Sequence, residues 1–201
     1  MLLPLLLSQL VLARVKYGGG GDWYNDPDVL PNLAHEVNRQ TTLSLVEREQ
    51  AVELTDPDLS AYPFLYLTGH GKVRFSDGEV AGLRAYLEGG GFLYVDDDYG
   101  LDESFRQELA KVFPDRQLEE VSFDHPIYHM LYDLEGPPKI HEHYEGPPKG
   151  YGVFIGGKLA LYYTYNSNVS DGWTAVHEDP DSVREKAFQM GVNMVLYALS
   201  Y

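Results

Sequence analysis

The stretch GGGFLYVDDDYG, residues 89–100, decides the fold. An apolar run, FLYV, leads directly into three consecutive aspartates and then a glycine. Such a run is typical of a buried strand. If the strand continues into the aspartates, alternation of side chains predicts Asp96 and Asp98 on one side of the sheet and Asp97 on the other. Either the aspartates form a solvated loop that caps the next helix, or they are the floor of a site.

Outward from this stretch, strand-like and helix-like segments alternate. A chain of 201 residues suits one domain with a sizeable core, and alternation of this kind predicts an α/β fold with a mainly parallel sheet. Strands are expected at residues 11–17, 50–54, 64–68 and 91–96, with a β-hairpin at 151–165. A long C-terminal helix follows the hairpin.

Four predicted helices begin with a residue that commonly caps a helix. One of these residues is followed by proline, and two are followed by a glutamate three positions later, as in a capping box. The four signals are Asp26 with Pro27, Ser76 with Glu79, Asp102, and Ser182 with Glu185. Gly89 stands where a C-terminal glycine cap belongs.

The net charge of −16 limits the partners of the chain. Nucleic acids and anionic membranes need basic patches, so we expect neither as a partner. A neutral polar ligand, a cation or a divalent metal is compatible with this charge. The absence of cysteine excludes thiol nucleophiles, disulfides and thiolate metal sites.

The first residues, MLLPLLLSQLVLA, are strongly apolar. Residues 1–12 are interpreted either as the remnant of an export signal or as an N-terminal lead-in to the first strand. The run is shorter than the roughly 20 residues that a membrane-spanning helix needs, so no membrane span is expected. An exported or periplasmic location is favoured over a cytoplasmic one.

Polar stretches follow three of the expected strands. They are GGGGDWYND after the first, TGHG after the third and DDDYG after the fourth. In open parallel sheets, ligands bind outside the carboxyl ends of the strands. The three stretches are therefore predicted to share one rim and to form a site.

The first stretch does not match known phosphate-binding motifs, because Trp23 stands where the third glycine of G-x-G-x-x-G belongs. Its glycines, including Gly20 and Gly21, allow the backbone to approach a ligand closely. Asp22, Trp23 and Tyr24 offer a carboxylate and stacking faces. The alternative is a tight turn with Trp23 packed as a lid on the core.

The second stretch places His70 between Gly69 and Gly71. Glycines on both sides free the backbone N–H groups to face a ligand, as an oxyanion hole requires. The alternative is a plain turn in which the histidine caps a carbonyl.

Three adjacent carboxylates repel one another, so at least one is expected to have a raised pKa, a cationic partner or a metal ion. In an extended segment, His141 and His143 face the same way and could both ligate one metal. Metal candidates are therefore Asp96, Asp98, His141 and His143. The alternative is that the histidines only hydrogen-bond to carboxylates.

Several motifs taken together resemble a bacterial family of uncharacterised proteins, domain of unknown function 4159. They are ARVKYGGGGDWYND, YPFLYLTGHG, LEGGGFLYVDDDYG, DHPIY, PKIHEHYEG, DGW and MGVNMVLYAL, and they span nearly the whole chain after residue 12. That family is similar to the ThuA-like proteins of the class I glutamine amidotransferase-like superfamily. The resemblance implies a flavodoxin-like three-layer α/β/α sandwich, formed by residues 13–201 as a single domain, and frequent export. It implies no activity.

The superfamily comparison implies roles for individual residues. Asp98, followed by Tyr99 and Gly100, occupies the place of the nucleophile elbow, and TGHG occupies that of the oxyanion loop. HEH, with Glu142 at its centre, falls where amidotransferases carry His and Glu. Because no thiol is present, glutamine hydrolysis through a thioester is excluded.

Three functions follow as hypotheses. The first is binding of a small polar ligand, for example a carbohydrate, at the ends of the strands. The second is a hydrolase, with Asp98 as base or nucleophile, His143 or His70 as its partner and an optional divalent metal. The third is a scaffold module of an envelope assembly. The expected ligand-binding residues are Gly20, Gly21, Asp22, Trp23, Tyr24, Gly69, Gly71, Asp97, Tyr99 and Glu142.

Overall fold

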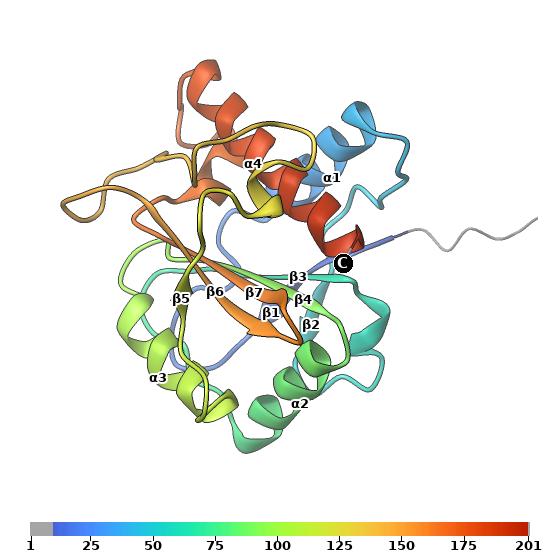
Figure 1. Cartoon of the computed structure of the whole chain (residues 1–201), viewed down its shortest axis with the longest axis vertical. Coiled ribbons are helices and arrows are strands. Elements are labelled where there is room, and N and C mark those ends of the chain that lie inside the picture. The colour runs from blue at the N-terminus through green and yellow to red at the C-terminus, as the bar shows by residue number, and fades with distance from the viewer. Residues whose placement is uncertain (1–9, 201) are drawn as a thin grey trace, which may run out of the picture.

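The computed structural model describes residues 10–200. Its centre is a seven-stranded sheet in the order β2-β1-β3-β4-β7-β6-β5 (Figure 1). The strands are β1 (Leu12–Lys16), β2 (Ala51–Glu53), β3 (Phe64–Leu67), β4 (Phe92–Asp96), β5 (Glu119–Glu120), β6 (Lys149–Ile155) and β7 (Lys158–Tyr165). The helices are α1 (Val29–Gln40), α2 (Asp77–Glu88), α3 (Asp102–Val112) and α4 (Asp181–Ser200), with short 3-10 turns η1 (Leu59–Ala61), η2 (Pro126–Tyr128) and η3 (Val169–Trp173).

The sheet is mostly parallel. Strands β2, β1, β3, β4 and β7 run parallel, whereas β6 and β5 add antiparallel strands at one edge. The predicted α/β class, mainly parallel sheet and C-terminal hairpin are therefore confirmed. Both glycines of the hairpin turn, Gly156 and Gly157, have positive φ values of 60° and 82°, as a two-residue turn between twisted strands requires.

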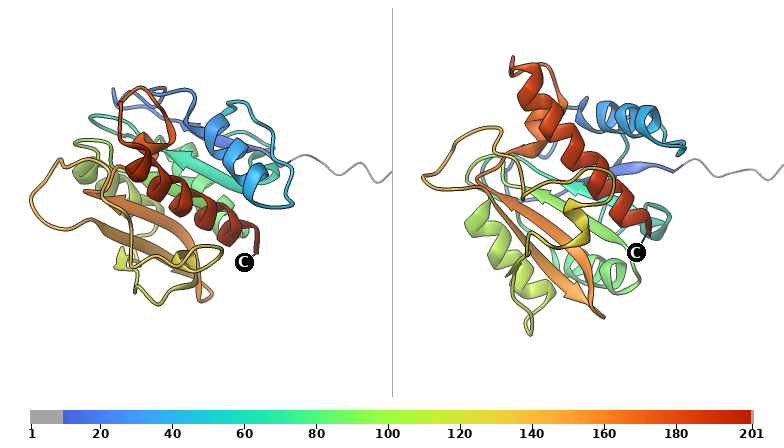
Figure 2. Two further views of the ribbon diagram at one scale, coloured as in Figure 1. Left: turned by 90° about the horizontal axis from the view of Figure 1, so that it is seen from above. Right: turned by 45° about the horizontal axis from the view of Figure 1, so that its top comes forward.

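Helices cover both faces of the sheet. Helices α1 and α4 lie together on one face, and α2 and α3 lie on the other (Figures 1 and 2). Each pair closes its own hydrophobic cluster against the strands. The chain is therefore an α/β sandwich, and the two covered faces explain why β3 and the first four residues of β4 are apolar.

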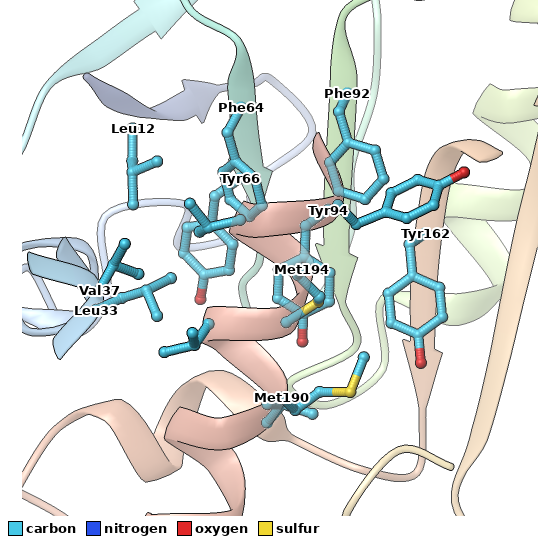
Figure 3. Packing of buried hydrophobic residues seen from close by; sticks show 14 of the residues in the cluster. Leu12, Leu33, Val37, Phe64, Tyr66, Phe92, Tyr94, Tyr162, Met190 and Met194 are labelled. Atoms are coloured by element: carbon cyan, nitrogen blue, oxygen red, sulfur yellow. The ribbon is translucent and has the colours of Figure 1, made fainter. Parts of the chain in front are cut away.

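The face under α4 carries a row of stacked aromatic rings (Figure 3). Tyr66, Tyr94 and Tyr162 come from neighbouring strands, with ring centroids 5.8 Å and 6.1 Å apart. Met190 and Met194 of α4 belong to the same cluster. This packing fixes the strands from which the polar loops emerge.

The start of α2 is as predicted. Ser76 and Glu79 form a complete capping box, and Gly89 is the C-cap. The reciprocal bonds satisfy backbone N–H groups that the first turn would otherwise leave free.

The predicted start of α1 is wrong. The helix begins at Val29 and the N-cap position is Asp28, so Pro27 lies outside the helix. Asp26 has a left-handed φ of 44°, and its carbonyl accepts a hydrogen bond from Arg14 Nη2 at 2.8 Å. The conformation of Asp26, in the loop before α1, is therefore stabilised by Arg14 of β1 and not by capping of α1.

The predicted caps of α3 and α4 are also wrong. Asp102 is the first residue of α3, and its carboxylate bonds to Arg106 at 2.7 Å instead of the helix backbone. Helix α4 already begins at Asp181, so Ser182 lies inside the helix and cannot cap it. At the start of α3 the carboxylate of Asp97, rather than that of Asp102, accepts a backbone hydrogen bond, from the Leu101 N–H at 2.9 Å.

The apolar N-terminal segment lies largely outside the described residues. Within residues 10–200, no helix has the length and apolar composition needed to cross a membrane.

Candidate functional site

The carboxyl ends of the parallel strands bring the three predicted polar stretches into contact. His70, which follows β3, hydrogen-bonds to Asp22 of the loop after β1. Its ring also lies beside Asp98, which follows β4, and Asn25 donates to the same carboxylate. The shared rim expected from the sequence is therefore present.

Asp98 is the buried centre of this rim. Its side chain is only 3% exposed, and its Oδ2 accepts from the Asn25 amide and lies 3.3 Å from His70 Nδ1. Its Oδ1 lies 3.2 Å from Asn168 Nδ2. Burial, with the nearby charge of Asp171, raises the pKa of Asp98 to about 6, although His70 opposes the shift. The carboxylate is thus poised to change charge just below neutral pH.

His70 is the exposed member of the pair, with 53% of its side chain accessible. Its Nδ1 lies 3.0 Å from Asp22 Oδ2. Partial burial disfavours the imidazolium, but the negative charges of Asp98 and Asp22 outweigh it and raise the pKa of His70. Within residues 10–200, no group hydrogen-bonds to His70 Nε2. Nε2 is therefore available to a ligand.

The backbone amides of TGHG are engaged within the protein. The His70 N–H donates to Asp22 Oδ1 at 2.5 Å, and the Gly71 N–H donates to the Tyr99 carbonyl at 3.0 Å. These amides were expected to face a ligand, and in this structure they do not. They instead tie the loops after β1 and β4 to the loop after β3.

Gly20 and Gly21, in the loop after β1, are constrained in different ways. The Gly21 N–H donates to the Lys72 carbonyl at 2.9 Å, and a Cβ on Gly21 would lie 2.9 Å from the His70 carbonyl oxygen. Gly20 has a φ of 93°, which favours glycine, but a Cβ there would meet no atom within 4 Å.

Trp23 is packed as a lid. Its ring lies against the hydrophobic cluster on the α2–α3 face, 5.8 Å from Lys16 Nζ, and Tyr24 meets it edge-on at 5.5 Å. Trp23 therefore packs on the core instead of offering a stacking face to a ligand.

Asp96 is a buried structural carboxylate. It accepts from the Ser170 N–H at 2.7 Å, the Ser170 hydroxyl at 2.8 Å and the Thr164 hydroxyl at 2.5 Å. Burial raises its pKa to about 7 despite these donors. With its oxygens occupied in this way, Asp96 joins β4 to β7 and η3.

Asp97 points to the opposite side, as strand alternation predicts. Its Oδ1 accepts from the Leu101 N–H at 2.9 Å, beside the start of α3. Burial raises its pKa to about 6. Of the three aspartates, only Asp98 reaches the rim.

The two histidines of HEH converge on the side-chain amide of Asn168. Asn168 Nδ2 lies 2.9 Å from His143 Nε2 and 3.4 Å from His141 Nδ1. His141 is further bound between Asp171 and Asp179, at 2.8 Å and 3.1 Å. These carboxylates raise its pKa to about 9, so it is an imidazolium with both nitrogens occupied. Neither nitrogen is free for a metal in this arrangement.

His143 differs from its neighbour. Burial lowers its pKa, so it is neutral near pH 7. Its ring lies 5.3 Å from that of Tyr99, which stacks on Tyr144 at 5.9 Å. Glu142, between the two histidines, is exposed and pairs with Lys139 at 3.1 Å, away from Asp98.

We call the residues that meet around Asp98 the strand-end site. They are Asp22, Asn25, His70, Asp98, His143 and Asn168.

Sequence reasoning missed the residue that holds the first loop. Arg14 is fully buried in β1 and donates to the carbonyls of Trp23, Asn25 and Asp26 at 2.8 to 2.9 Å. An arginine within an otherwise buried strand was the available signal. Asn168 and Asp171 were missed as well, and only the DGW motif marked that region.

A second group of side chains has the geometry to hold a metal ion. Asp26, Asp171 and His177 each place one donor atom within 4.8 Å of the others. They come from the loop before α1, from η3 and from the segment before α4.

Comparison with known proteins gives one family match. A family model described as a domain of unknown function (DUF4159) matches residues 11–199. Among curated proteins, no match to the chain is found.

Proposed function

The chain belongs to the DUF4159 family, and we propose that its strand-end site binds a small polar ligand that carries hydroxyl groups, such as a carbohydrate. The observation that carries this proposal is the pair formed by Asp98 and His70. One member is a buried carboxylate, and the other is a half-exposed imidazole whose Nε2 has no hydrogen-bond partner in the described part of the chain.

The charges of this pair favour a neutral ligand. Ionised Asp98 accepts hydrogen bonds and protonated His70 donates them, so together they match a hydroxyl group, which does both. An anion would meet a chain of net charge −16 and the further carboxylates of Asp22 and Asp171.

Aromatic side chains border the site. Tyr99 is 53% exposed, and a stack of rings continues from it through Tyr144 to Tyr165, with centroids 5.9 Å and 5.0 Å apart. Exposed aromatic faces offer a flat apolar surface to the C–H face of a sugar ring, while carboxylates and imidazoles bind its hydroxyls.

The finer fold relationship is also a proposal. The parallel strands follow the order β2-β1-β3-β4-β7, which corresponds to the order 2-1-3-4-5 of flavodoxin-like sheets. This order supports a ThuA-like, class I glutamine amidotransferase-like relationship, in which Asp98 takes the place of the nucleophile. A superposition on an amidotransferase that puts another residue at the nucleophile would overturn it.

Binding is tested by calorimetry with a panel of neutral monosaccharides, disaccharides and polyols. We expect at least one saturable binder for the wild type and at least about tenfold weaker binding for Asp98→Asn, because a buried hydrogen-bonding partner is lost. Asp115→Asn makes the same chemical change at an exposed position near the end of α3 and should bind as the wild type does. A panel without any binder, or equal affinities for both variants, would contradict the proposal.

A carboxylate–imidazole hydrolase is the second candidate. Two histidines of the strand-end site have opposite pKa shifts, since that of His70 is raised and that of His143 is lowered. Groups whose pKa values are pushed apart can serve as acid and base at one pH. Asp98 or His143 would accept a proton from the attacking water, and His70 would donate one to the leaving oxygen.

The hydrolase is distinguished from a binding protein by product formation. A bound sugar or ester that is released unchanged after prolonged incubation supports binding alone. Turnover that disappears in Asp98→Asn and persists in Asp115→Asn supports the hydrolase.

A further inference from the structure

We propose that Asp26, Asp171 and His177 form a binding site for a divalent first-row transition-metal ion. The inference is independent of the proposed ligand, because none of these three residues belongs to the strand-end site.

The spacing of the donor atoms fits one ion. His177 Nε2 lies 3.1 Å from Asp26 Oδ2 and 3.8 Å from Asp171 Oδ1. Two donors that each lie about 2.1 Å from an ion, at a tetrahedral angle, are about 3.4 Å apart. Both separations from His177 lie within about 0.4 Å of this value, and all three donor atoms lie within 4.8 Å of one another.

Asp171 turns one carboxylate oxygen toward the proposed ion and uses the other to bind neighbouring side chains. Its side chain is only 6% exposed, and its Oδ2 is fully engaged by His141 at 2.8 Å and Asn168 at 2.6 Å. Within residues 10–200, its Oδ1 has no hydrogen bond, and the nearest charged partner is His177 at 3.8 Å. This oxygen therefore faces His177 with no hydrogen-bond donor among the described residues, and a metal ion between the two side chains would give its negative charge a positive partner.

The surrounding groups hold the three ligands in place. His141 bridges Asp171 and Asp179, which fixes the plane of the Asp171 carboxylate. Arg14 holds the backbone of Asp26 through its carbonyl at 2.8 Å. Such outer contacts typically orient metal ligands in proteins.

The donor set indicates which ions the site would take. One imidazole and two carboxylates suit Zn²⁺ or Mn²⁺, whereas Mg²⁺ and Ca²⁺ prefer oxygen ligands alone. The side chains of His177 and Asp26 are 31% and 20% exposed, so water can reach the ion. Three protein ligands and an open position are typical of catalytic rather than structural zinc sites.

The test uses the full chain without an affinity tag, stripped with chelator and titrated with Zn²⁺, Mn²⁺ or Mg²⁺ in a calorimeter. We expect one equivalent of Zn²⁺ or Mn²⁺ to bind and to raise the melting temperature, and Mg²⁺ to bind at least about tenfold more weakly. His177→Ala and Asp26→Asn should each weaken binding at least about tenfold.

His35→Ala is the matched control, because His35 is an exposed histidine on α1 that pairs with Glu47. It should bind metal as the wild type does. Far-ultraviolet circular dichroism of every variant verifies the fold, and Asp26→Asn preserves the shape of the side chain if His177→Ala is unstable. The proposal is overturned if the wild type shows no saturable binding, or if both ligand variants bind one equivalent with unchanged affinity.

Loss of metal binding and loss of sugar binding are separable outcomes. Asp98→Asn should change the metal affinity much less than His177→Ala does, because Asp98 acts on Asp171 only through its charge, and His177→Ala should leave a metal-free sugar titration unchanged. If Asp98→Asn alone abolished metal binding, the ion would belong to the strand-end site and this assignment would be wrong.

Discussion

His70 Nδ1 lies 3.3 Å from Asp98 Oδ2, and the two residues follow neighbouring parallel strands, β3 and β4. The contact joins an exposed imidazole to a carboxylate that is almost completely buried. It exists because the carboxyl ends of parallel strands meet at one edge of the sheet. The proposed ligand binding depends on the charge of this pair.

Ligand binding should weaken as the pH falls through about 6. The pKa of Asp98 is raised to about 6 by burial, so the carboxylate is ionised at pH 7.5 and protonated at about pH 5. A protonated Asp98 loses its attraction for His70 and part of its capacity to accept hydrogen bonds. Calorimetry between pH 5 and 8 measures the effect, and an affinity that rises on acidification would contradict it.

The stability of the fold should fall as the pH rises from about 4 to about 7. Burial raises the pKa of Asp96 from 3.8 to about 7, so the folded state binds more protons than the unfolded state in this range. The stabilisation is complete below pH 4 and is lost as the pH passes through 7.

Asp96→Asn should flatten this pH dependence, since the amide does not titrate there. Urea unfolding at pH 5 and pH 8 gives the two free energies. A difference between the two pH values as large in Asp96→Asn as in the wild type would contradict the assignment to Asp96, and the exposed control Asp115→Asn should keep the wild-type difference.

Gly69→Ala should destabilise the protein more than Gly100→Ala. Both glycines have positive φ, 143° and 78°, but only at Gly69 would a Cβ collide, 2.3 Å from the Tyr17 hydroxyl. The collision should add about 1–3 kcal/mol to the cost of the backbone conformation. If urea unfolding showed the same loss of unfolding free energy for both variants, the loop around Gly69 would accommodate the Cβ without an energetic cost.

Arg14→Met should unfold the loop after β1. The guanidinium is fully buried, lies 3.0 Å from Glu49 and binds three carbonyls of that loop. Removing one partner of a buried charged network costs about 3–5 kcal/mol. Lys16→Met is the control, because the Lys16 side chain is 41% exposed and pairs with Glu53 at the surface. It should lower the free energy of unfolding by less than about 1 kcal/mol, as expected for loss of a surface ion pair.

Much of the fold could be predicted from the sequence. The alternation of elements, the hairpin turn and the Ser76–Glu79 capping box depend on local patterns, and the structure confirms them. Strand β5 could not be found, because its two residues, Glu119 and Glu120, are both exposed and polar. The start of α1 was missed because a tertiary contact, from Arg14 to the loop, decides the conformation of Asp26.

The site was predictable only in part. The rim followed from polar stretches at the ends of strands, because topology alone brings such ends together. Asp171 and His177 carry no recognisable spacing to Asp26, and they meet it only because η3 and the segment before α4 lie next to the loop before α1. A contact between segments so distant in sequence leaves no local pattern.

Imidazole ¹H–¹⁵N spectra of the histidines, recorded during titration with the best sugar of the panel, test the central claim most directly. Ligand binding at the strand-end site predicts that the resonances of His70 and His143 shift together and saturate. His35 on α1 and His129, paired with Asp133, lie outside that site and should not move. A sugar that saturates in the calorimeter and leaves His70 and His143 unshifted would contradict the account.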